Sequence, residues 1–215
     1  MYTQYVKRIL DVLLSSIAFV VLSPVMIVVA ILVRCEFGSP MIFSQERPGL
    51  GEKVFTLYKF RTMTSATDAN GELLPDAQRL TALGKALRKY SLDELPELIN
   101  IILGNMSIVG PRPLLVSYLP YYSQEERLRH TVRPGLSGLA QIYGRNSVSW
   151  NRRMAYDVEY VRHLSFFLDA KIVLTTIAQV LFKMSAVAED TQKTEGNFAA
   201  QRLVELERQQ TEVAH

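Results

Sequence analysis

A run of about 22 residues without a charged side chain, Val12 to Val33, lies near the start of the chain. As an α-helix this run is about 33 Å long, close to the thickness of the hydrocarbon core of a bilayer. Lys7 and Arg8 precede it and Arg34 follows it. Soluble domains rarely contain so long an uncharged run, and no small-residue cleavage site follows it. We therefore expect a membrane helix rather than a buried core helix or a cleaved signal peptide.

Ser23 and Pro24 stand in the middle of this run. Proline removes one backbone hydrogen bond and disfavours helical geometry at the residue before it, so we expect a sharp bend here. Two topologies remain open from the residues alone. The helix either spans the bilayer with a kink, or turns back so that both of its ends lie on one side. Basic residues at both ends fit the second topology, with both ends on the cytoplasmic side.

The composition limits the classes of partner. The chain has 215 residues, enough for one sizeable domain, and a formal net charge of +3, which suits an anionic membrane surface or a phosphorylated ligand. The basic residues are scattered and balanced by 21 acidic ones, which argues against a nucleic-acid partner. One cysteine, Cys35, excludes an intramolecular disulfide and a cysteine-rich zinc site, and three histidines disfavour a histidine-rich metal site.

A β-hairpin is predicted over residues 39–63. Strand-like segments at Met41–Gln45 and Val54–Phe60 flank a turn rich in proline and glycine. Because side chains alternate along a strand, Lys59 and Arg61 should project from the same face. The predicted hairpin thus follows the membrane helix directly, and one face of the hairpin is basic.

The remainder is mostly helical by pattern, so the predicted fold class is α+β and mostly helical. We expect a membrane anchor over residues 1–36, a compact domain over 37–184, and a polar tail over 185–215. Within the last two, the sequence predicts a polar loop at 64–76, helices at 80–89, from about Pro96 to Leu103, at 123–130, 151–163 and 171–183, a turn-prone stretch at 133–141, a linker at 189–197, and a solvated or partner-binding helix at 199–208.

Asp93 and Glu94 are adjacent carboxylates at the start of a predicted helix. Adjacent carboxylates repel each other, so the pKa of one should rise unless a cation neutralises the pair. One interpretation is a capping box, in which Ser91 and Glu94 satisfy the first turn of the helix. The other is a site for phosphates, in which the pair acts with a divalent metal or with arginines.

Further motifs favour the second interpretation by their order along the chain. These motifs are Lys7-Arg8, Ser23-Pro24, Arg47-Pro48-Gly49, residues 58–63, residues 91–98, Gly110-Pro111-Arg112-Pro113 and residues 133–138. Together they resemble the bacterial sugar transferase family, the monotopic polyprenol-phosphate phosphoglycosyl transferases, over roughly residues 5–183. The length of the chain resembles the small single-domain members of this family, such as those that open bacterial N-linked glycosylation.

This resemblance implies a specific reaction. Family members transfer a phospho-sugar from a UDP-sugar to undecaprenyl phosphate and release UMP, which is the first membrane step of glycoconjugate assembly. Asp93 matches the nucleophile that forms the covalent intermediate of a ping-pong mechanism, and Mg²⁺ is required, with Asp93 and Glu94 as its expected ligands. In the family the Ser23-Pro24 motif makes the helix re-entrant. The catalytic domain is then expected on the cytoplasmic face of the bacterial inner membrane.

Basic residues are needed because an anionic nucleophile must approach an anionic diphosphate. The candidates for binding the phosphates are Lys59, Arg61, Arg88, Arg112 and Arg145. The alternative for each is a solvated charge or a salt bridge. Asp157 and Asp169 are expected to orient such a cation, to assist proton transfer, or to form structural ion pairs. Tyr143 and Trp150 are expected either to pack in the core or to stack on uracil.

Two other functions use the same features. A membrane-attached, metal-dependent phosphohydrolase would pass the phosphate to water and release free sugar phosphate. A non-enzymatic membrane scaffold would not need the carboxylate of Asp93. The sequence does not name the sugar, does not say whether the glycan is destined for protein, lipopolysaccharide or capsule, and leaves both a monomer and a homo-oligomer open.

Overall fold

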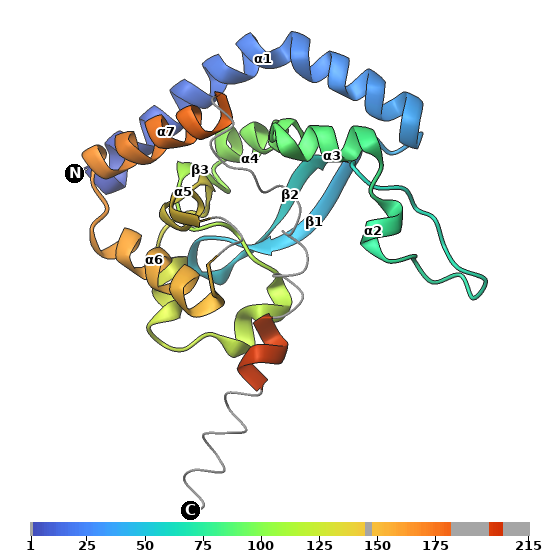
Figure 1. Cartoon of the computed structure of the whole chain (residues 1–215). Coiled ribbons are helices and arrows are strands. Elements are labelled where there is room, and N and C mark those ends of the chain that lie inside the picture. Colours follow the sequence, from blue (N-terminus) through green and yellow to red (C-terminus); the bar gives the residue numbers. More distant parts are fainter. Residues whose placement is uncertain (1, 145–147, 182–197, 204–215) are drawn as a thin grey trace, which may run out of the picture.

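The computed structural model describes residues 2–144, 148–181 and 198–203. Helices dominate these residues and two small sheets accompany them, which confirms the predicted α+β, mostly helical class (Figure 1). The helices are α1 (Lys7–Phe37), α2 (Asp76–Arg79), α3 (Ala82–Lys89), α4 (Glu97–Leu103), α5 (Leu139–Gly144), α6 (Trp150–Arg162) and α7 (Phe166–Leu181). A π-helical turn at Tyr2–Val6 and 3₁₀ turns at Leu50–Glu52, Leu92–Glu94, Val116–Tyr121 and Glu126–Thr131 complete the helical part.

The membrane helix predicted from the uncharged run is α1, which continues through Pro24 for 31 residues. Figure 1 shows it as an arch whose two ends lie lower than its middle. A proline inside a helix is a standard cause of such bending, and the hydroxyl of Ser23 donates 2.7 Å to the carbonyl of Val20 beside it. Among the described residues α1 is the helix long and apolar enough to cross a membrane. The expected break is therefore a bend within one helix.

The predicted hairpin is confirmed. β1 (Ile42–Pro48) pairs antiparallel with β2 (Val54–Phe60), and β1 begins one residue later and ends three residues later than expected. Phe60 is buried against Val33 of α1 and Leu87 of α3, so the hairpin, α3 and the second half of α1 share one core.

Asn100 fixes α4 against the hairpin. Its side chain is fully buried, donates 2.7 Å to the carbonyl of Thr56 and accepts 3.1 Å from the amide of Tyr58. These bonds satisfy backbone groups on the free edge of β2, where Asn100 acts in place of a further strand. The start of α4 is thereby held against Lys59, and Gly104, with φ of 94°, ends the helix as predicted.

A second sheet was not predicted. β3 (Ser107–Val109) and β4 (Gly135–Ser137) pair in parallel, and the backbones approach so closely that a Cβ on Gly135 would lie 2.0 Å from the amide nitrogen of Gly110. Only glycine fits here. The glycines that looked merely turn-prone therefore serve a close contact between two strands distant in sequence.

Several helices differ from the predicted bounds. α7 begins five residues earlier than expected, and residues 126–131 form a 3₁₀ turn rather than an α-helix. A reciprocal pair of side-chain bonds starts that turn, from the Ser123 amide to Glu126 at 2.8 Å and from the Glu126 amide to Ser123 at 3.2 Å.

Residues 198–203 are helical and pack on the compact domain. Phe198 is fully buried in an aromatic cluster with Tyr118, Tyr122 and Trp150. The first part of the tail helix predicted at 199–208 is therefore present, and it begins next to the buried Phe198. The predicted linker lies outside the described residues.

Candidate active site

The Asp93–Glu94 pair lies in the 3₁₀ turn between α3 and α4. Ser91 before the turn adopts the left-handed conformation, with φ of 54°, and its side chain makes no capping hydrogen bond. The capping-box interpretation is therefore wrong. Pro96 stands immediately before α4, one position earlier than predicted.

Glu94 is held by two cations from different parts of the chain. Its Oε1 lies 2.8 Å from Nζ of Lys59 on β2 and 2.7 Å from Nη2 of Arg112. Burial alone would raise the pKa of Glu94, but Arg112 and Lys59 outweigh burial and hold this pKa well below its usual range. Glu94 therefore remains ionised and fixes both cations beside the neighbouring carboxylate.

A third carboxylate, Glu97, belongs to the same cluster and was not singled out from the sequence. Its Oε1 lies 3.1 Å from Nζ of Lys59, and its side chain is 2% exposed. Burial raises the pKa of Glu97 to about 7, with Glu94 adding to the shift and Lys59 opposing it. The sequence signal that could have identified Glu97 was its spacing from Glu94. Residues three apart on a helical turn share a face, so Glu97 should lie beside Glu94.

Asp93 differs electrostatically from Glu94. It is 7% exposed, and burial raises its pKa, with the negative charge of Glu94 adding to the shift. Lys59, Arg88 and Arg112 act in the opposite direction. The environment thus separates the two adjacent carboxyls: Glu94 is held firmly ionised, whereas Asp93 is the more basic of the pair.

The remaining basic residues predicted to bind phosphates differ in their contacts. Arg88 lines the same cavity as Asp93, and its Nε donates 3.0 Å to the hydroxyl of Thr62. Arg61 also lines this cavity, but its guanidinium donates to the carbonyl of Phe37 at 3.3 Å and to the hydroxyl of Ser65 at 2.6 Å. Arg61 therefore ties the end of α1 to the loop after the hairpin. Arg145, the remaining candidate, lies outside the described residues.

Asp157 forms a buried ion pair with Arg129, which was not identified from the sequence. Nη2 of Arg129 lies 2.8 Å from Oδ2 of Asp157 and donates 2.7 Å to the carbonyl of Arg112. Nη1 of Arg129 donates 2.9 Å to the hydroxyl of Tyr122. This arrangement corresponds to the structural ion pair predicted as one alternative for Asp157, and Arg129 in turn holds the backbone of Arg112.

Asp169 lies in the first turn of α7 and binds the N-terminal part of the chain. Its carboxylate accepts from the hydroxyl of Tyr2 at 2.6 Å, from Nζ of Lys7 at 2.6 Å and from the hydroxyl of Tyr160 at 2.8 Å. These contacts correspond to the structural alternative predicted for Asp169. They tie the start of α1 to the start of α7.

The two aromatic candidates pack against protein. Trp150 is 2% exposed in the aromatic cluster, with the guanidinium of Arg153 4.5 Å from its ring centroid. Tyr143 stacks on Tyr156, with ring centroids 5.2 Å apart. Stacking of Trp150 on uracil is therefore wrong.

One cavity of about 1660 Å³ joins the charged cluster to the membrane helix. Lys59, Asp93, Glu94 and Arg112 belong to its polar lining, and apolar residues of α1 and α7 form a large part of its apolar lining. A ligand with a charged phosphate and an apolar portion is the kind of molecule that such a lining can accept.

The donor set fits magnesium bound mainly through a substrate. Among the described residues there is no group of three histidine, cysteine, aspartate or glutamate side chains that could hold a metal ion. Mg²⁺ does not require one, because it is commonly held by one or two carboxylates together with substrate phosphates and water. Asp93 and Glu94 can supply those carboxylates.

Adjacent carboxylates among partly buried cations, in a cavity that opens onto a membrane-type helix, define an enzyme acting on phosphorylated substrates at a membrane. Comparison with known proteins gives the particular family: a family model described as bacterial sugar transferase matches residues 2–183. The chain therefore belongs to the bacterial sugar transferase family, as its motifs predicted.

Individual relatives agree. A protein of Bacillus subtilis (strain 168) named "Uncharacterized sugar transferase EpsL" is 48% identical over 188 residues, which cover 87% of this chain and 91% of that protein. The exopolysaccharide production protein ExoY of Rhizobium meliloti (strain 1021) is 40% identical, covering 81% of this chain and 84% of its own.

A UDP-glucose:undecaprenyl-phosphate glucose-1-phosphate transferase of Klebsiella pneumoniae is 38% identical over 84% of this chain, which spans 41% of that longer protein. Family membership and α1 together indicate a membrane-associated sugar transferase.

Proposed function

We propose that the chain transfers a phospho-sugar from a UDP-sugar to undecaprenyl phosphate and releases UMP. The observation that carries the proposal is the buried Asp93 carboxylate, which faces the same cavity as a cluster of cations and the apolar walls of α1 and α7. The names of the Klebsiella relative and of an Aeromonas hydrophila relative, 36% identical over 82% of this chain, describe reactions of this type with glucose and N-acetylgalactosamine donors.

Asp93 acts as the nucleophile in this proposal. Its carboxylate oxygen attacks the β-phosphorus of the UDP-sugar, and the bond from that phosphorus to the bridging oxygen breaks, so UMP leaves with the bridging oxygen. The sugar phosphate is then held on Asp93 as an acyl phosphate. A phosphate oxygen of undecaprenyl phosphate attacks the same phosphorus, which frees the carboxylate and forms the lipid diphosphate sugar. The raised pKa of Asp93 supports this role, because a more basic carboxylate is a better nucleophile once ionised.

The cations prepare the site for two anions. Lys59 and Arg112 are fixed by Glu94 at 2.8 and 2.7 Å, so their positive charge is already in place beside Asp93 when the diphosphate arrives. Groups fixed in advance stabilise developing charge without reorganising during the reaction. Arg129 contributes by holding the carbonyl of Arg112. Arg88 is a further candidate for the phosphates, since it also lines the cavity.

Asp93 and Glu94 would hold Mg²⁺ in this proposal. When bound, the ion supplies Lewis-acid stabilisation to the phosphate oxygens and neutralises part of their charge. The protein's own part is to present the two carboxylates on one rigid turn between α3 and α4.

The membrane arrangement follows from α1. Its arch shape, with Lys7 and Arg8 at one end and Arg34 at the other, supports a re-entrant helix whose ends both lie on the cytoplasmic face of the bacterial inner membrane. An interfacial site is what the reaction needs, because one substrate is soluble in water and the other is anchored in lipid.

The test measures UMP release from a panel of UDP-sugars with undecaprenyl phosphate and Mg²⁺, for wild type and Asp93→Asn. Lipid-dependent release from one donor, lost by at least about a thousandfold in Asp93→Asn, is expected for loss of a nucleophile. Free sugar phosphate as the product would indicate a phosphohydrolase instead. Unchanged release by a folded Asp93→Asn protein would contradict the role given to this residue.

A further inference from the structure

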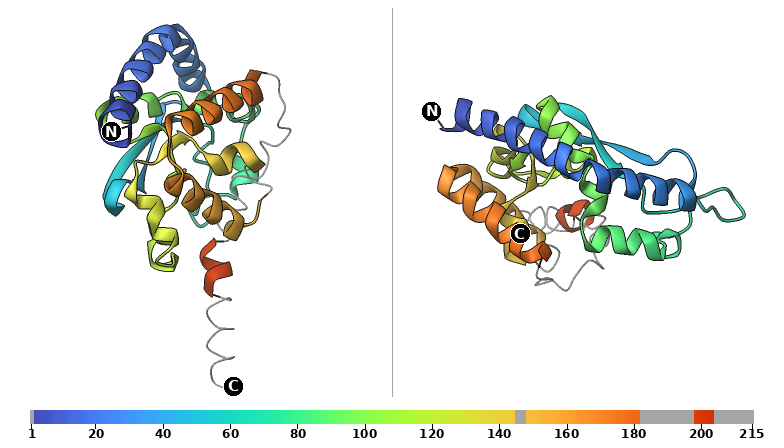
Figure 2. Two further views of the ribbon diagram at one scale, coloured as in Figure 1. Left: turned by 90° about the vertical axis from the view of Figure 1, so that its left-hand side faces the viewer. Right: turned by 90° about the horizontal axis from the view of Figure 1, so that it is seen from above.

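The cavity continues beyond the charged cluster as a trough between α1 and α7. Leu14, Ala18 and Leu22 line it from α1, and Val173, Leu174 and Ile177 line it from α7. The three residues of α1 are spaced four apart, so they form one stripe along the inner side of the arch. Figures 1 and 2 show α7 running alongside the N-terminal half of α1 on the same side of the molecule.

The two helices are tied together where both begin. Asp169 at the start of α7 binds Tyr2 and Lys7, each at 2.6 Å. Away from this tie the walls of the trough remain open, since Leu174 is 68% exposed and Ile177 is 49% exposed although both line the cavity. Such apolar side chains gain stability when an apolar partner covers them.

We propose that this trough, called the α1–α7 groove here, holds the hydrocarbon chain of the polyprenyl phosphate acceptor; the proposal rests on the proposed function. One argument is continuity, because the groove and Asp93 belong to the same cavity. An acceptor whose chain lies in the groove has its phosphate directed toward Lys59 and Arg112. The other argument is size, since about 1660 Å³ exceeds the range of about 300–1,000 Å³ typical of sites for small ligands.

The double variant Leu174→Gln/Ile177→Gln tests the groove, and Phe167→Gln is its matched control. Phe167 lies on the same helix and is 82% exposed, but it does not line the cavity. A general loss of membrane contact should therefore affect Phe167→Gln at least as strongly. Two quantities are measured for each protein: the KM for undecaprenyl phosphate, and the UMP released by enzyme and UDP-sugar without any lipid, which reports formation of the covalent intermediate.

The expected result is a rise of about tenfold in the KM for undecaprenyl phosphate in the double variant, with lipid-independent UMP release unchanged and Phe167→Gln close to wild type. An unchanged KM in the double variant would overturn the proposal, as would the same rise in Phe167→Gln. If the double variant retains less phosphatidylglycerol on purification while its KM is unchanged, the groove binds bulk phospholipid and the proposal is wrong. Absence of UMP release by wild type from every donor would instead refute the proposed function itself.

Discussion

Removing the carboxylate of Asp157 should destabilise the protein strongly, because it leaves a buried guanidinium without its counter-ion. The side chains of Arg129 and Asp157 are 2% and 3% exposed, and two hydrogen bonds of 2.8 and 3.1 Å join them. After Asp157→Leu, Arg129 keeps two neutral acceptors, the hydroxyl of Tyr122 and the carbonyl of Arg112. Breaking one side of a buried ion pair typically costs about 3–5 kcal/mol.

This cost converts to a melting temperature. With an unfolding entropy of about 2.1 cal/mol/K per residue, a chain of 215 residues unfolds with roughly 0.45 kcal/mol/K, so Asp157→Leu should lower Tm by about 7–11 °C. The chain offers a built-in probe, since its single tryptophan, Trp150, is buried on the same helix as Asp157. Thermal unfolding in detergent, followed by tryptophan fluorescence, measures the shift.

The double variant Arg129→Met/Asp157→Leu is the control. Replacing both charges by apolar groups removes the unpaired charge, so most of the lost Tm should return. Activity should nevertheless fall in the double variant, because Arg129→Met removes the donor to the carbonyl of Arg112. A shift below about 2 °C in Asp157→Leu, or a double variant no more stable than the single one, would refute this account of the pair.

Two further predictions concern single buried side chains. The pKa of Glu97 is about 7 in the fold and 4.5 in the unfolded chain, so the native state binds more protons at this site between these values, and the contribution of Glu97 to stability should fall by about 3 kcal/mol as pH rises from 4.5 to 7. Glu97→Gln should lose this pH dependence in Tm measured at pH 5 and pH 8; an unaltered dependence would disprove the assignment. Phe198→Ala should cost about 3–5 kcal/mol and shift Trp150 emission to the red, whereas Leu203→Ala, 46% exposed, should change neither; a neutral Phe198→Ala would show that the cluster does not need the tail.

Local patterns were sufficient to predict several elements. The uncharged run gave α1 and Pro24 gave its bend, because both signals lie within one segment. Alternation predicted β2, and Gly104 marked the end of α4. Each of these features depends on residues close together in sequence, where propensity and periodicity act directly.

Long-range contacts explain what the sequence did not reveal. The strands β3 and β4 are three residues each and are held by a partner far along the chain, so no periodicity could develop. The motif order correctly pointed to Lys59 and Arg112 as neighbours of the dyad, although their roles on phosphates stay predictions. Arg129 and Glu97 were missed because their importance lies in their partners, and Arg61 binds backbone and loop atoms that no motif specifies.

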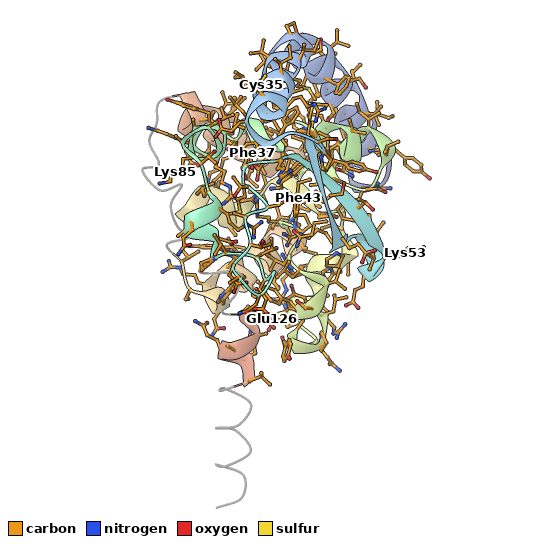
Figure 3. All side chains as sticks on the ribbon, turned by 90° about the vertical axis from the view of Figure 1, so that its right-hand side faces the viewer. Cys35, Phe37, Phe43, Lys53, Lys85 and Glu126 are labelled. Atoms are coloured by element: carbon orange, nitrogen blue, oxygen red, sulfur yellow. The ribbon has the colours of Figure 1, made fainter. Side chains whose placement is uncertain are left out.

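The packing of Phe198 also determines the orientation of the protein when it is attached to a surface near residues 198–203. Arg202 pairs with Glu126, and Figure 3 shows Glu126 at the opposite end of the molecule from Cys35 on α1. A bead or sensor surface coupled near Leu203 would thus leave α1 and α7 facing outward. Immobilised in this way, the enzyme could be supplied with nanodiscs in flow, and its encounters with lipid could be counted separately from its encounters with the soluble donor.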